Sequence, residues 1–250
     1  MLAFFAAPIA FSPAGNIAPL GKGEVRLGFD LTYVPTPGDD IRHPEICYTE
    51  NKTENTELSS VFPRPRISLG LGGGLALEAT YLPPVTVMDA TPNLFQVALG
   101  YNRALGTAGM SLLLRGHATI GQVKGPITCS PDVIQTTNNT GTCYSSQPSD
   151  DTYKPNMVGF EGALAFGGNS KLRTYVGVGV TALRPRFHVN FTDLSGFVDT
   201  TQVIVDLTRF SAFAGGAWSL SPKLALTAEL YSQPQDVTTI RFGGQWTIRK

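Results

Sequence analysis

The sequence predicts an all-β fold, a ten-stranded antiparallel up-and-down β-barrel, and three observations predict it. Apolar and polar residues alternate with period two in ten separate segments, which is typical of strands with one apolar and one polar face. Short turns and longer polar loops separate these segments, as in a chain of hairpins. No run of about 18 apolar residues occurs, so a membrane-spanning helix is not expected.

The strands follow one another from residue 23 to the end of the chain. In the first, Val25, Leu27 and Phe29 alternate with Arg26 and Gly28 almost without error. A glycine run, 72–74, predicts a tight turn after the second strand, because glycine adopts positive φ. In the eighth strand the alternation slips once, which predicts a β-bulge. The ten strands are expected within residues 23–34, 64–71, 75–82, 93–103, 109–123, 156–166, 171–183, 203–220, 223–231 and 238–250.

The apolar strand faces could turn outward to lipid or inward to a core, as in a soluble lipocalin-like barrel. Three features favour lipid. No Lys falls inside a predicted strand, since Lys22, Lys171, Lys223 and Lys250 lie at the expected periplasmic ends and the other lysines lie in loops. The polar faces are rich in the small residues Gly, Ala, Ser and Thr, as a narrow lumen requires. Aromatic residues near strand ends suit the interfacial girdles of a transmembrane barrel. These interface aromatics are Tyr33, Tyr81, Tyr101, Trp218 and Trp246.

The last strand, TTIRFGGQWTIRK, carries Phe242 and Trp246 on its apolar face. It resembles the closing strand of bacterial outer-membrane β-barrels, although Arg249 and Lys250 stand where an aromatic terminus is usual. WSLSPKLALTAEL also resembles a periplasmic hairpin of such proteins, so the chain after about residue 20 is similar to small porin-like outer-membrane barrels. The resemblance implies localisation in the bacterial outer membrane, short periplasmic turns and long extracellular loops. It also implies outer-membrane lipids and the barrel-assembly machinery as partners, with other envelope proteins as further candidates.

The first residues, MLAFFAAPIAFSPAG, are apolar and rich in small side chains. They resemble the apolar region of a secretory signal peptide, although no positive charge precedes them. The alternative is an apolar segment packed into or against the barrel. We therefore divide the chain into residues 1–15, a signal-peptide remnant or N-terminal segment, and residues 16–250, a single barrel domain.

Three cysteines, Cys47, Cys129 and Cys143, lie in the long polar loops. They lack the spacing of a zinc site, so we expect no metal. Cys129 and Cys143 bracket a short polar segment and suit a disulfide in an oxidising compartment. Cys47 could pair with either of them instead.

The polar strand faces carry charges of both signs, which must be paired or hydrated inside a barrel. They either form ion pairs that fill the lumen or line a narrow path for ions or polar solutes, since ten strands fall between filled and open barrels. The lumen-lining candidates are Glu24, Arg26, Asp30, Arg66, Glu78, Arg115, His117, Glu161, Arg173, Glu229 and Arg241.

These features favour a monomeric barrel with a structural or narrow transport role, without cofactor or catalysis. The formal net charge of zero argues against nucleic acid as a partner. An alternative is a surface adhesion or recognition barrel acting through its extracellular loops. A remoter alternative is a barrel hydrolase: His117, Thr119 and Glu161 resemble the His-x-Ser plus Glu set of lipid A deacylases, and Asp39, Asp40 and His43 lie in an omptin-like position.

Overall fold

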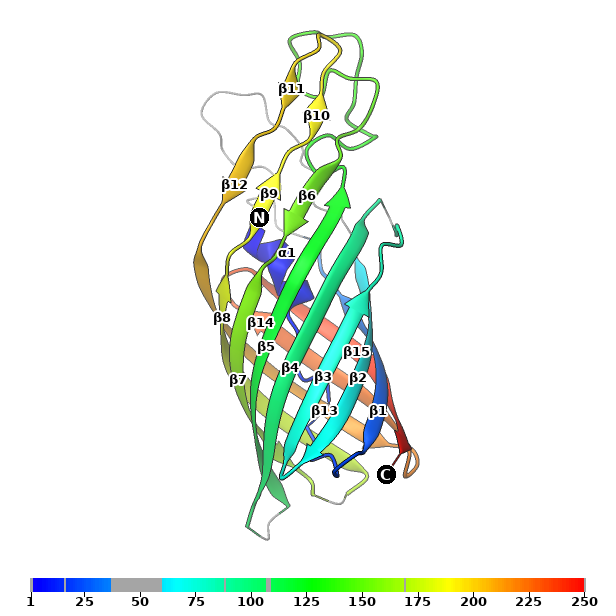
Figure 1. The fold of residues 1–250 in the computed structure, drawn as a ribbon, viewed down its shortest axis with the longest axis vertical. Coiled ribbons are helices and arrows are strands. Elements are labelled where there is room, and N and C mark those ends of the chain that lie inside the picture. Colours follow the sequence, from blue (N-terminus) through cyan, green and yellow to red (C-terminus); the bar gives the residue numbers. More distant parts are fainter. Residues whose placement is uncertain are drawn as a thin grey trace.

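The computed structural model describes residues 2–15, 17–36, 60–87, 89–106, 109–168 and 170–249. It forms a tall barrel of tilted strands with a narrower extension at one end, the upper end in Figure 1. The wall of the barrel consists of β1 (Val25–Tyr33), β2 (Val61–Gly72), β3 (Leu75–Leu82), β4 (Thr91–Leu105), β5 (Met110–Gly125), β7 (Met157–Phe166), β8 (Leu172–Leu183), β13 (Leu207–Ser219), β14 (Leu224–Gln233) and β15 (Val237–Arg249).

Each wall strand pairs antiparallel with the strands before and after it in this order. The first and last strands, β1 and β15, also pair, from Val25–Arg249 to Tyr33–Ile240, and thereby close the barrel. The predicted fold of ten antiparallel strands in an up-and-down order is therefore confirmed. Because β1 and β15 pair, the sheet has no free first or last strand, and most backbone polar groups of the wall pair between neighbouring strands.

The prediction of a bulge in the eighth wall strand, β13, is wrong. β13 keeps one continuous register with both β8 and β14. The apparent slip comes from Phe213, an aromatic residue that faces the lumen rather than the outside. Its ring lies over Gly177, where a side chain would clash, and stacks on Tyr231 with ring centroids 6.0 Å apart.

Above the wall, short strands extend the sheet into a structure that we call the head (residues 126–156 and 184–206). β6 (Asp151–Lys154) pairs antiparallel with the upper end of β5, β9 (Arg186–His188) pairs with β6, and β12 (Gln202–Ile204) pairs with β9. β10 (Phe191–Thr192) and β11 (Val198–Asp199) form a separate hairpin at the top (Figure 1). The prediction that no Lys lies inside a strand is wrong at this end of the barrel, because Lys124 lies in β5 and Lys154 lies in β6.

The outer face of the wall is a continuous apolar surface. Every wall strand presents large exposed hydrophobic side chains on alternate residues, such as Phe29, Leu99, Val178 and Phe242, whereas the residues between them point inward. The five predicted interface aromatics are all exposed on this face. Apolar surface on this scale is stable against lipid rather than water. The chain is therefore a transmembrane β-barrel with the architecture of outer-membrane barrels.

No helix in the described part of the chain is long and apolar enough to cross a membrane. The helix α1 (Leu2–Ile9) instead lies inside the upper half of the barrel (Figure 1). From α1 the chain runs down through the lumen to the lower end, where β1 begins. Ala6, Ala7, Phe11 and Ile17 are almost completely buried along this path. We call residues 2–15 together with Ile17 the plug.

Candidate functional site: the charged lumen and its plug

Three oppositely charged pairs in the lumen are set directly by strand register. Asp30 and Arg64 face each other across β1 and β2, Arg115 and Glu161 across β5 and β7, and Glu229 and Arg241 across β14 and β15. Their N–O distances are 3.8, 2.9 and 3.4 Å, respectively. Directly opposed side chains on one face of a sheet lie close enough to pair, so the register itself creates these contacts.

Arg66 and Glu78 join two of these pairs into one network. Arg66 lies 3.3 Å from Asp30 and 2.7 Å from Glu78, and Glu78 lies 3.2 Å from Arg115. This network of ion pairs therefore extends from β1 to β7. The six side chains of the three pairs are buried, and so are Arg66 and Glu78. Among these eight side chains, four arginines balance four carboxylates. This balance meets the requirement that charges removed from water be paired.

The four arginines also hold the plug. Arg64 donates to the carbonyls of Pro8 (2.8 Å) and Ala10 (3.1 Å), and Arg66 donates to that of Pro13 (3.1 Å). Arg115 donates to the carbonyl of Phe11, and Arg241 donates to that of Ala7. The last carbonyls of a helix lack partners within the helix and carry its negative dipole end. Guanidinium groups from the wall therefore satisfy the end of α1 and the segment that follows it.

Phe11 is the centre of this arrangement. Its ring lies 4.5 Å from the guanidinium carbon of Arg66 and 4.6 Å from that of Arg115. A desolvated cation over an aromatic face is worth about 2 kcal/mol. Phe11 is also fully buried, so it both fills the lumen and stabilises the two arginines.

Glu229 fixes the lower part of the plug. Its carboxylate accepts hydrogen bonds from the Ser12 hydroxyl, the Ala14 backbone N–H (2.9 Å) and the Tyr175 hydroxyl (2.7 Å). Tyr175 in turn accepts one from the Gly15 N–H at 2.9 Å. Gly15 has a φ of 83° and lies against Thr227, so a side chain would be strained and would clash.

Three of the four remaining lumen candidates lie apart from these buried pairs, at the lower end of the barrel. Glu24, Arg26 and Arg173 line a polar cavity of about 250 Å³ at the lower end of the barrel, together with Lys223 and Gln245. Glu24 pairs with Arg26 at 3.1 Å, whereas Arg173 donates to the Gly168 carbonyl at 2.6 Å. This cavity lies below the plug, since Gly15 and Ile17 form part of its lining.

His117 is buried inside the lumen, and its Nε2 lies 3.7 Å from Glu161. Thr119 accepts a hydrogen bond from Gln96 (3.1 Å). The set that resembles a lipid A deacylase site thus lies inside the lumen rather than on the lipid face. Asp39, Asp40, His43 and Cys47 lie outside the described residues.

Several lumen residues were missed by the sequence analysis. Arg64 shares the inward parity of Arg66, but its neighbours Pro63 and Pro65 look like the start of a strand rather than its interior. Ser12 lies in the segment assigned as a signal-peptide remnant or N-terminal segment, without a predicted partner. Tyr175 faces the lumen on a strand whose other inward residues include Gly177 and Gly179. Parity could have found Arg64 and Tyr175, whereas the partner of Ser12 depends on the path of the plug.

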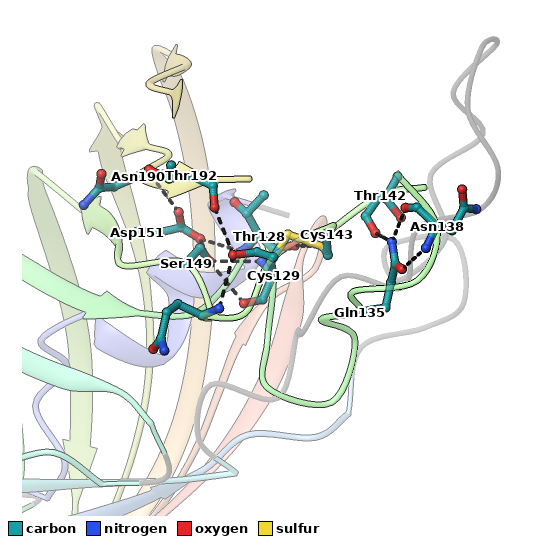
Figure 2. Close-up of a disulfide and its surroundings, with 12 residues drawn as sticks. Thr128, Cys129, Gln135, Asn138, Thr142, Cys143, Ser149, Asp151, Asn190 and Thr192 are labelled. Atoms are coloured by element: carbon teal, nitrogen blue, oxygen red, sulfur yellow. Dashed lines mark hydrogen bonds between the residues drawn. A yellow bond between two sulfur atoms is a disulfide. The ribbon is translucent and has the colours of Figure 1, made fainter. Parts of the chain in front are cut away.

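The head contains the disulfide between Cys129 and Cys143, whose Cα atoms are 5.5 Å apart (Figure 2). Asp151, which is fully buried, organises the surrounding backbone. Its carboxylate accepts hydrogen bonds from the Thr128 and Asn190 N–H groups and from the Ser149 hydroxyl. The disulfide loop is thereby joined to the strands that leave the barrel.

Comparison with known proteins gives structural neighbours only. No family model and no curated protein matches the chain. The attachment invasion locus protein Ail of Yersinia pestis is 10% identical, with a TM-score of 0.33, over 90% of this chain and 98% of that chain. Neisserial surface protein A is 8% identical (TM-score 0.34; 90% and 96% covered).

The N-terminal β-barrel domain of Pseudomonas aeruginosa OprF is 9% identical, with a TM-score of 0.35, over 92% of this chain and 100% of that domain. At these TM-scores the likeness carries no argument about this chain. Its architecture rests instead on its own strand pairing and outward apolar face.

Proposed function

We propose that this protein is a bacterial outer-membrane barrel, closed at rest by its own N-terminal segment, that acts as a rigid base for a surface recognition head. The observation that carries the proposal is the filled lumen. The plug contacts all four buried arginines of the lumen pairs, and Arg64, Arg115 and Arg241 retain almost no exposed surface. A lumen packed in this way serves stability rather than flow.

In this proposal, the head is the part of the protein that binds a partner at the cell surface. It stands above the lipid-facing wall and is held by the disulfide, by Asp151 and by two bonds between its segments. The Ser145 hydroxyl donates to the Thr192 carbonyl, and the Leu194 N–H donates to the Tyr144 carbonyl, both at 2.9 Å. Loops fixed on a rigid scaffold are suited to binding.

Two measurements test the proposal. In a planar bilayer, the intact chain should show no steady conductance while its heat-modifiable electrophoretic mobility shows a folded barrel. Residues 126–150 grafted onto an unrelated outer-membrane barrel should transfer cell-surface binding, whereas a graft of the same length with scrambled sequence should not. Steady conductance by the intact chain, or a graft without binding, would contradict the respective half of the proposal.

A second candidate is a narrow polar path that opens when the plug leaves. It is favoured by the nature of the plug contacts, because the arginines bind backbone carbonyls while retaining carboxylate partners of their own. Deleting residues 2–15 should then leave a paired, charged and hydrated lumen that conducts. Phe11→Ala offers a milder test and should produce brief openings if the deletion variant does not fold. A folded deletion variant without conductance would exclude this path.

A further inference from the structure

One part of the barrel wall is split. The β2–β3 register runs from Gly72–Leu75 to Ile67–Ala79 and ends there, although residues 64–66 of β2 and residues 80–82 of β3 lie next along the two strands, all within the described residues. On the other sides the pairing is complete, because β2 stays paired with β1 up to Val61–Tyr33 and β3 with β4 up to Leu82–Leu94. Among the described residues, the ladder between β2 and β3 therefore has no pairs between residues 64–66 and residues 80–82.

The sequence of β2 explains the split. Even-numbered residues of this segment direct their backbone groups to the β1 side, as shown by the bonds between Gly70 and Glu24 and between Ser60 and Val34. Since backbone groups of successive residues alternate between the two neighbours, those of Pro63 and Pro65 face β3. Proline has no N–H and cannot donate to a ladder. The Pro65 carbonyl instead accepts a bond from the Thr80 hydroxyl.

An apolar pocket of about 100 Å³ lies at this split. Its lining includes Phe62 and Pro63 on the β2 side, Leu82 and Ala90 on the β3 side, and Phe5 and Ile9 of the plug. Among the side chains of the lining, one carries a polar group, the hydroxyl of Tyr153, which already donates to the Leu2 carbonyl at 2.8 Å. The pocket therefore offers no free hydrogen-bonding group of a lining side chain to an occupant.

The pocket also reaches the lipid-facing surface. Val61 and Val87 line it and are 39% and 45% exposed. On the outer face, Val61 and Pro63 stand opposite Tyr33 and Leu31, which belong to the exposed apolar surface. An apolar cavity of about 150 Å³ accommodates a benzene-sized group, so this pocket suits the end of one hydrocarbon chain and excludes a headgroup.

We propose that the split between β2 and β3 is a lateral binding site in which the alkyl tail of a membrane lipid reaches α1 through the wall. The headgroup stays outside, and the tail end packs against Phe5 and Ile9. A free fatty acid shares the same chemistry and is the alternative source of the chain.

Photocrosslinking tests the site directly. The intact chain is placed in phosphatidylcholine nanodiscs doped with a phosphatidylcholine that carries a diazirine at the end of one acyl chain, and adducts are mapped by peptide mass spectrometry. Phe4, Phe5 and Ile9 are buried inside the barrel, so adducts on α1 arise only from a chain within the pocket. A second arm uses a free fatty acid with the same diazirine.

Two variants should abolish the α1 adducts while adducts on the outer face persist. Ala90→Phe fills the pocket, and Pro63→Val with Pro65→Val restores the donors that the β2–β3 ladder lacks. Val85→Phe is the matched control, because Val85 lies in the same connection as Ala90, is exposed and does not line the pocket. Heat-modifiable mobility shows that each variant is folded.

Adducts on α1 from the lipid probe, lost in both variants and kept in the control, support the proposal. An intact chain without α1 adducts, or adducts that persist in both variants, overturns it. Adducts from the free fatty acid alone overturn the membrane lipid as the source.

Discussion

The lumen and the head both bury polar groups, but they satisfy them in different ways. In the lumen, side chains from opposite walls pair with each other and with the carbonyls of the plug, as Arg115 does with Glu161 and Phe11. In the head, one carboxylate, that of Asp151, accepts bonds from backbone N–H groups, and a covalent bond joins Cys129 to Cys143.

The difference follows from the surroundings. In the lumen the plug excludes water from the charged side chains, so each buried charge needs a partner of opposite sign. The head rises beyond the wall, and a few fixed contacts are enough to order it. The lumen should therefore respond strongly to the loss of a charge, and the head mainly to the loss of its covalent and backbone links.

Arg115→Ala should give the largest effect. The change leaves Glu78 and Glu161 with one partner fewer inside the lumen and frees the Phe11 carbonyl. Removing one partner of a buried pair costs about 3–5 kcal/mol. Urea unfolding in detergent, followed by electrophoretic mobility, measures the loss.

Arg184→Ala is the matched control for Arg115→Ala, because its pair with Asp206 is 3.7 Å long and both side chains are more than three-quarters exposed. Exposed pairs contribute about 0–1 kcal/mol. Equal losses from the two variants would show that the lumen charges are hydrated rather than buried.

Val178→Lys compares two exposed apolar surfaces that differ in their surroundings. Val178 on the wall is 66% exposed and Ile204 in the head is 60% exposed. A lysine on the lipid face near the middle of a barrel costs about 2–4 kcal/mol, whereas Ile204→Lys should change stability by less than about 0.5 kcal/mol. Refolding yield and urea unfolding in lipid vesicles measure both. A tolerated Val178→Lys would contradict lipid contact at this position.

Cys129→Ser combined with Cys143→Ser should loosen the head and leave the barrel unchanged. The closed loop spans a sequence separation of 14 residues, and a loop of about this size corresponds to about 3 kcal/mol in the chain-entropy model. Limited proteolysis should cut residues 129–143 faster, while heat-modifiable mobility stays the same. Loss of the folded barrel in this variant would show that the two regions are coupled.

The barrel wall differs from the plug and the head in how much of its structure can be predicted from the sequence. Alternation identified all ten wall strands, because each has one face in lipid and one in the lumen, and it placed Asp30, Glu78 and Arg241 inward. It could not show where the plug lies, since the plug has no period of its own and its position depends on arginines far along the chain. It also could not predict β6, β10 and β11, because short strands in a polar loop bury too little to leave a pattern.

The smallest effect concerns the turn at the tip of the head. Asp193 accepts hydrogen bonds from the Ser195 hydroxyl (2.7 Å) and the Phe197 N–H (2.8 Å), and the Ser195 bond, followed by the backbone bonds, lowers the pKa of this carboxyl. A carboxyl whose pKa is lower in the folded state stabilises the fold above its unfolded pKa, about 3.9, and loses this contribution as the pH falls through the folded pKa. The amide chemical shift of Phe197 should therefore titrate with a midpoint below about 3.9, and Asp193→Asn should abolish the titration. A midpoint at or above that value would show that the carboxylate is not held by the turn.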